Sequence, residues 1–161
     1  MATNPFTSPT TSALRAALAA LPLAGLLTAS AGAAAAPAGW KVIKDRKGNC
    51  QMIVPSTWKG EVSAASPEDR QAMASIHLLP GKNWDESKLM AQQVMVPSAV
   101  LEDSAERLWF AYGTNAGETD WYITVPGPLG PCAAQVTFKN ETLADAAKQI
   151  ATSVAVSPAA Q

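Results

Sequence analysis

Residues 132–154 read CAAQVTFKNETLADAAKQIATSV, and this stretch decides the fold. Between Cys132 and Phe138 small or apolar residues occupy every second position, which is the pattern of a half-buried strand. Farther along, apolar residues recur at helical spacing and form one continuous stripe, which predicts an amphipathic helix. The stripe consists of Leu143, Ala146, Ala147, Ile150, Ala151 and Val154. A strand that leads into such a helix predicts a sheet packed against a helix.

The segments upstream add further strands and a second helix. Alternating or apolar runs bounded by Gly, Pro and Asn predict strands at residues 40–45, 50–54, 61–66, 71–79, 99–103, 107–112 and 120–125. Asn83 and the acidic residues after it predict a helix that runs from about residue 84 to 95 and that Pro97 closes. Because the strands form hairpins rather than βαβ units, we expect an α+β fold. It would be a single domain with a mostly antiparallel sheet flanked by two or so helices on one face.

Both ends of this pattern resemble the PsbP-like family. The residues that carry the resemblance at the first hairpin are Asp45, Gly48, Cys50, Val54, Pro55 and Trp58. The last strand and the helix after it resemble the end of the same family. The resemblance implies an α+β fold with an antiparallel sheet flanked by helices. Its known members are lumenal photosystem accessory subunits and exported bacterial proteins, so it also implies a non-catalytic role and supplies no catalytic residues.

The first 38 residues differ in composition from the rest. Arg15 is the only charged side chain among them, and a short apolar run after it gives way to a string of small residues. This pattern is typical of a secretory signal peptide, which we expect over residues 1–38, with cleavage somewhere in 31–38. An uncleaved anchor is the alternative, but the run is shorter than the roughly 20 apolar residues that span a bilayer. One domain over 39–158 and a tail over 159–161 would remain, exported to the periplasm or secreted, without a stable membrane span.

Two cysteines, Cys50 and Cys132, lie in the expected domain. An even number of cysteines in an oxidising compartment favours a disulfide, and two buried free thiols are the alternative. Both residues begin predicted strands and share a face with apolar neighbours. We therefore expect a Cys50–Cys132 bond.

The chain offers little catalytic chemistry. Its one histidine, His77, lies on the polar face of its predicted strand, which indicates a surface residue. The acidic residues at 85–86 and 102–106 are interpreted as solvated turns and a helix start. We therefore expect no catalytic residue, no metal and no cofactor.

The remaining feature of the sequence that indicates function is a set of aromatic residues. Trp109 and Tyr112 belong to one predicted strand, Trp121 and Tyr122 to another, and alternation divides them between the two faces of the sheet. One set can form the core, whereas the other must lie under a helix or be exposed. Because exposed aromatic residues mark binding patches, we expect these four residues to bind a ligand or partner.

Charge narrows the range of partners. The chain has 12 basic and 13 acidic residues, a formal net charge of −1, whereas nucleic-acid-binding proteins usually carry a basic excess. We expect no nucleic acid as partner. The sequence predicts an exported, non-catalytic binding or assembly-accessory protein of the cell envelope that docks a protein or ligand through an aromatic surface. The alternative is a small exported hydrolase that uses carboxylates.

Overall fold

The structure is a computed structural model that describes residues 36–69, 71–113, 117–139 and 141–158. The chain divides into residues 1–30 and residues 31–161, and the fold described is that of the second part. Most of the predicted signal peptide and the tail 159–161 lie outside the described residues. The signal peptide and its cleavage therefore stay predictions.

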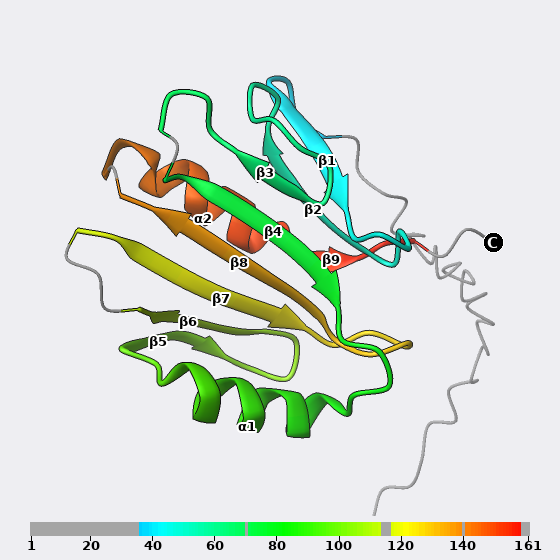
Figure 1. Cartoon of the computed structure of the whole chain (residues 1–161). Coiled ribbons are helices and arrows are strands. Elements are labelled where there is room, and N and C mark those ends of the chain that lie inside the picture. Colours follow the sequence, from blue (N-terminus) through cyan, green and yellow to red (C-terminus); the bar gives the residue numbers. More distant parts are fainter. Residues whose placement is uncertain (1–35, 70, 114–116, 140, 159–161) are drawn as a thin grey trace, which may run out of the picture. The chain divides into compact units, whose positions relative to one another are not determined.

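The described chain contains nine strands and two α-helices (Figure 1). The strands are β1 (Trp40–Lys44), β2 (Cys50–Pro55), β3 (Ser63–Ala65), β4 (Met73–Leu78), β5 (Ala99–Asp103), β6 (Leu108–Tyr112), β7 (Thr119–Val125), β8 (Cys132–Phe138) and β9 (Ala155–Val156). The helices are α1 (Trp84–Met95), a 3-10 turn η1 (Glu141–Leu143) and α2 (Ala144–Thr152). None of the helices in the described residues is long and apolar enough to cross a membrane.

The strands form two antiparallel sheets rather than one. The larger has the order β3-β4-β8-β7-β6-β5, and the smaller has the order β1-β2-β9. The α+β class with antiparallel pairing is thus confirmed, but the division into two sheets was not predicted. The smaller sheet is completed by β9, whose two residues pair with Cys50 and Gln51 about a hundred positions earlier in the chain. Such a short, distant pairing leaves no periodic pattern in the sequence.

The two helices lie on opposite faces of the larger sheet. Neighbouring residues of a strand point to opposite faces of the sheet. Two neighbouring residues of β7 therefore show which helix covers each face. Ile123 packs in the same core as Ile150 of α2, whereas Tyr122 packs with Ala91 of α1. The expectation that both helices cover one face is therefore wrong. Strands β6 and β7 carry apolar residues on both faces, and each face needs its own cover.

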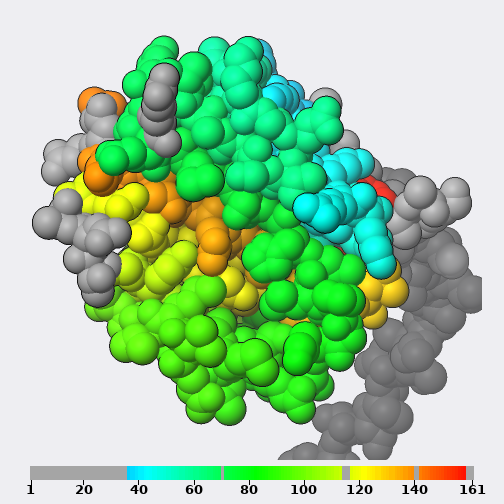
Figure 2. All heavy atoms as spheres, viewed as in Figure 1, coloured from blue at the N-terminus to red at the C-terminus, as the bar shows by residue number. Residues whose placement is uncertain are grey.

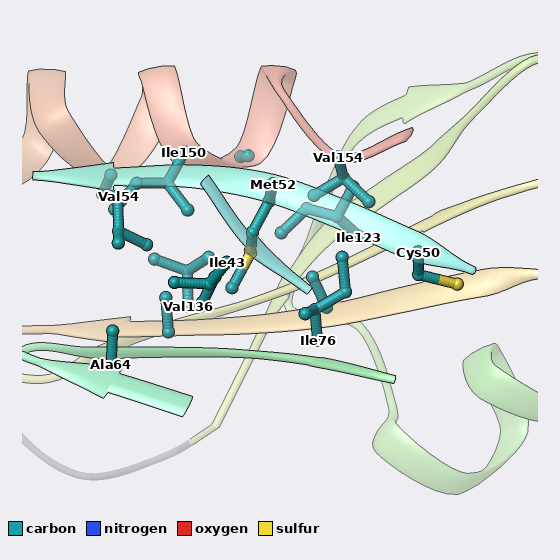
Figure 3. Close-up of a cluster of buried hydrophobic side chains, with 14 of the residues drawn as sticks. Ile43, Cys50, Met52, Val54, Ala64, Ile76, Ile123, Val136, Ile150 and Val154 are labelled. Carbon is teal, nitrogen blue, oxygen red and sulfur yellow. The ribbon is translucent and has the colours of Figure 1, made fainter. Parts of the chain in front are cut away.

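The larger core lies between the two sheets and α2. Figure 3 shows its side chains gathered between strands of both sheets and α2. Buried members include Ile43, Met52 and Val54 from the smaller sheet, Ile76, Ile123 and Val136 from the larger sheet, and Ala147, Ile150 and Ala151 from α2. The predicted helical stripe is thus the face that α2 buries, and each large apolar side chain contributes roughly 1.5–3 kcal/mol.

A disulfide joins the two sheets. Cys50 begins β2 and Cys132 begins β8, both are buried, and their Cα atoms are 5.5 Å apart. The predicted bond is confirmed. Its strands are not neighbours within one sheet, so the bond links the smaller sheet to the larger one where both strands begin.

Asp45 fixes the turn of the first hairpin. Its buried carboxylate accepts hydrogen bonds from the backbone N–H of Cys50 at 2.7 Å and from that of Lys47 at 3.1 Å. Gly48 adopts a positive φ of 73°, a conformation that glycine takes without steric cost. These contacts account for the spacing of Asp45, Gly48 and Cys50 in the sequence.

Candidate functional site

The four aromatic residues expected at a binding surface are covered on both faces of the sheet. Trp109 is 8% exposed and Tyr122 is 4% exposed, while Trp121 and Tyr112 are half-buried. The rings of Trp109 and Trp121 pack edge to face in the larger core, with centroids 4.9 Å apart. Tyr112 and Tyr122 lie on the other face, beneath α1. The four residues therefore do not form one exposed aromatic surface, and their part in binding stays a prediction.

Helix α1 covers its face of the sheet loosely. The residues that it buries are Ser87 and Ala91, its two smallest, while Met90 and Val94 are 50% and 74% exposed. In the described chain no strand contacts α1 as closely as β2 and β8 contact α2. Space remains between α1 and the sheet beside these two small side chains.

That space is a pocket of about 200 Å³ between α1 and the sheet. It is lined by His77, Leu79, Lys82, Ser87, Met90, Ala91, Val94, Met95 and Tyr122. Figure 2 shows a recess on the face of the larger sheet that α1 covers. Yellow and orange atoms of β7 and β8 form the floor of this recess, and green atoms surround it. The pocket exceeds the roughly 150 Å³ that holds a benzene molecule and is smaller than the roughly 300 Å³ of the smallest drug-sized sites. Its size suits a small ligand with an apolar body.

Ser87 is the most informative residue of the lining. It is 5% exposed, and its hydroxyl has no hydrogen-bond partner among the described residues. A buried hydroxyl without a partner costs about 1–3 kcal/mol. Ser87 is therefore a lining residue whose buried hydroxyl has no partner among the described residues.

The other polar groups of the lining are His77, Tyr122 and Lys82. Burial lowers the pKa of His77 below its ordinary value, against a smaller opposite effect of Asp45, so the imidazole is neutral at pH 7. Burial also raises the pKa of Tyr122, which keeps its phenol neutral. Lys82 is exposed at the edge of the pocket. The lining thus combines neutral hydrogen-bonding groups with a single ammonium.

Contacts in its first half hold α1 in place over the sheet. The Asn83 side chain accepts a hydrogen bond from the N–H of Asp85 at 2.9 Å, which confirms the predicted start of the helix. On the outer side, Lys88 forms a 2.8 Å ion pair with Asp103 of β5. The ring of Trp84 packs against the second cluster of buried residues, which lies beneath the helix and consists of Ala91, Leu108, Phe110, Tyr122 and Ala133. These contacts therefore hold the wall of the pocket that α1 forms.

Two of the carboxylates considered for a hydrolase, Glu102 and Asp103, form ion pairs on β5. Asp103 pairs with Lys88, and the Lys88 hydrogen bond lowers the pKa of its carboxyl. Glu102 lies 3.6 Å from the guanidinium of Arg107. Among the described residues, no group of three or more His, Cys, Asp or Glu side chains is arranged to hold a metal ion.

Sequence reasoning named one residue of this pocket, Tyr122, as a site residue. It interpreted His77 as a surface residue, and His77 is exposed in the structure as well as being part of the lining. It missed Ser87 and Ala91. The signal that could have found them is the weak apolar stripe of residues 84–95. A serine and an alanine one turn apart occupy the positions where a closely packed helix would carry larger side chains.

No protein-family model matches the chain, and no curated protein matches it. A solved structure that matches is the solution structure of cyanobacterial PsbP (CyanoP) from Synechocystis sp. PCC 6803. The TM-score is 0.49 and the identity is 15%, over 80% of this chain and 98% of that chain. That protein carries the name of the family that the ends of the sequence resemble. The likeness concerns the fold, and no residue role or activity is carried over from it.

Proposed function

We propose that the chain is an exported, non-catalytic binding protein that holds a small apolar ligand in the pocket beneath α1. The observation that carries this proposal is the buried, unpaired hydroxyl of Ser87 in the wall of an otherwise largely apolar pocket. The sequence left a protein partner and a small ligand open as alternatives. The pocket favours the ligand, because its volume and lining match a small molecule.

The four predicted aromatic residues have different parts in this proposal. Tyr122 lines the pocket, and Tyr112 packs in the same layer beneath α1. Trp109 and Trp121 stabilise the sheet from the opposite face. Binding therefore depends on the tyrosine layer and on α1 rather than on an open tryptophan surface.

Two features support action outside the cytoplasm. The leader has the composition of a signal peptide, and disulfides persist in oxidising compartments. We expect the exported protein to lack residues 1 to about 31–38. Its intact mass would show this directly, and a mass that corresponds to all 161 residues would contradict it.

Calorimetric titration with 1-octanol, an uncharged probe with an apolar chain, tests the proposal. We expect a single site in the wild-type chain and its loss in Ala91→Met, which fills the pocket. Leu89→Met changes the same helix at a position that is 57% exposed and outside the lining, so binding should persist there. No binding to the folded wild type, or equal binding by Ala91→Met, would contradict the proposal.

A further inference from the structure

We propose that the ligand of this pocket is a small monocarboxylate with an extended apolar chain. Its carboxylate would lie at Ser87 and Lys82, and its chain would follow α1 towards Met95. This inference rests on the proposed function, because it names the chemical class that the same pocket takes. Three properties of the lining support the inference: the positions of its polar residues, its charge and its length.

The polar and apolar parts of the lining follow one another along the chain. Lys82 precedes α1, and Ser87 lies in its first half. The lining residues farther along the helix are apolar, namely Met90, Ala91, Val94 and Met95. A ligand that satisfies both parts is amphiphilic, with its polar group towards the start of α1.

Charge identifies the polar group as an anion. Lys82 is the only permanently charged residue in the lining, and no aspartate or glutamate is among the described residues that form it. Asp85 and Glu86, in the first turn of α1, are exposed and do not line the pocket. A carboxylate would accept hydrogen bonds from the Ser87 hydroxyl and the Lys82 ammonium, and hydrogen bonds to a charged group are the stronger kind. A cation would find no counter-charge there.

The length of the lining along α1 sets the length of the ligand's apolar chain. Ser87 and Met95 are eight positions apart on one helix, which corresponds to about 12 Å at about 1.5 Å per residue. The extended chain of octanoate, together with its carboxylate oxygens, spans most of this distance. Octanoate therefore matches the pocket in length as well as in charge.

Titration of the full chain with matched probes tests the inference. The probes are octanoate, 1-octanol and octylammonium, which share a chain and differ in charge, together with hexanoate and dodecanoate. We expect octanoate to bind more tightly than 1-octanol and octylammonium to bind most weakly. Affinity should rise about fourfold per methylene from hexanoate to octanoate and then level off, because further methylenes extend beyond the pocket.

Two substitutions separate the polar contacts. Lys82→Met should weaken octanoate about three- to fivefold, as expected for an exposed ion pair, and leave 1-octanol unchanged. Lys59→Met removes an exposed lysine outside the lining and should change neither. Ser87→Ala should weaken octanoate about tenfold and yet raise the melting temperature of the free protein, because it removes an unpaired buried hydroxyl. A raised melting temperature with unchanged octanoate affinity would show that the hydroxyl is buried but has no part in binding.

The outcomes distinguish this inference from the proposed function. The inferred ligand class is wrong if 1-octanol or octylammonium binds as tightly as octanoate, or if Lys82→Met and Ser87→Ala leave octanoate affinity unchanged. The proposed function, binding of a small apolar ligand in the pocket, would still be supported in that case. If none of the probes binds, the proposed function fails as well. Preference for octanoate, lost in both lining variants and kept in Lys59→Met, supports the inference.

Discussion

At the scale of single residues, the buried carboxylate of Asp45 stabilises the turn of the first hairpin. Asp45→Ala should lower the free energy of unfolding by about 1.5–3 kcal/mol, because it removes two hydrogen bonds to a buried carboxylate. Chemical denaturation measures the change. Asp69→Ala removes a single exposed hydrogen bond to the N–H of Gln71 and should cost less than about 0.5 kcal/mol. Equal effects of the two variants would contradict the structural role of Asp45.

His77 should make stability depend on pH. Burial lowers its pKa in the folded chain, with Asp45 opposing, so the unfolded chain takes up the proton first as the pH falls. The contribution of His77 is fully present above the ordinary pKa of about 6.5 and is lost as the pH falls through the folded-state value. Denaturation between pH 7.5 and 5.5 should therefore show the wild type losing stability relative to His77→Gln. Parallel curves for the two proteins would rule this out.

At the scale of single elements, the end of α1 is strained. Val96 has a positive φ of 47°, which is unfavourable for a β-branched residue, and Pro97 follows it. Val96→Asn should raise the free energy of unfolding by about 0.5–1 kcal/mol, because asparagine tolerates this conformation. Val94→Asn, an exposed helical position with a residue of the same type, is the matched control and should give no gain. A gain at residue 94 that equals the gain at residue 96 would contradict strain as the cause.

The elements that could be predicted from sequence are those with strong local signals. Helix α1 begins and ends where Asn83 and Pro97 predict, and β8 has the bounds that its alternation gives. Strand β9 could not be predicted, because its pairing with β2 depends on contacts far apart in the chain. The same holds for the separation into two sheets.

The candidate site was harder to predict than the fold. Alternation correctly separated Trp121 from Tyr122, but which face remained open depended on where α1 packs. The pocket lies between α1 and the sheet, so the part of Ser87 in its lining depends on how these two elements pack. A periodic pattern records which side chains a helix buries but not the distance at which it packs.

At the scale of the whole molecule, the disulfide is the strongest single link between the sheets. It closes a loop over 82 positions, for which the loss of chain entropy in the unfolded state gives about 4.5 kcal/mol as an upper figure. Replacing both Cys50 and Cys132 by alanine should lower the free energy of unfolding by up to this amount. The wild type measured with a reductant should approach the double variant. A reduced wild type as stable as the oxidised one would contradict this account.

The central claim is that the pocket beneath α1 binds a small apolar ligand. Methyl resonances of the methionines test it most directly, because Met90 and Met95 line the pocket, Met52 is buried in the other core, and Met73 is exposed on the sheet away from the lining. On titration with 1-octanol, we expect the Met90 and Met95 signals to shift and saturate together while those of Met52 and Met73 stay in place. Unchanged Met90 and Met95 signals, or a shift of exposed Met73 as large as theirs, would contradict the claim.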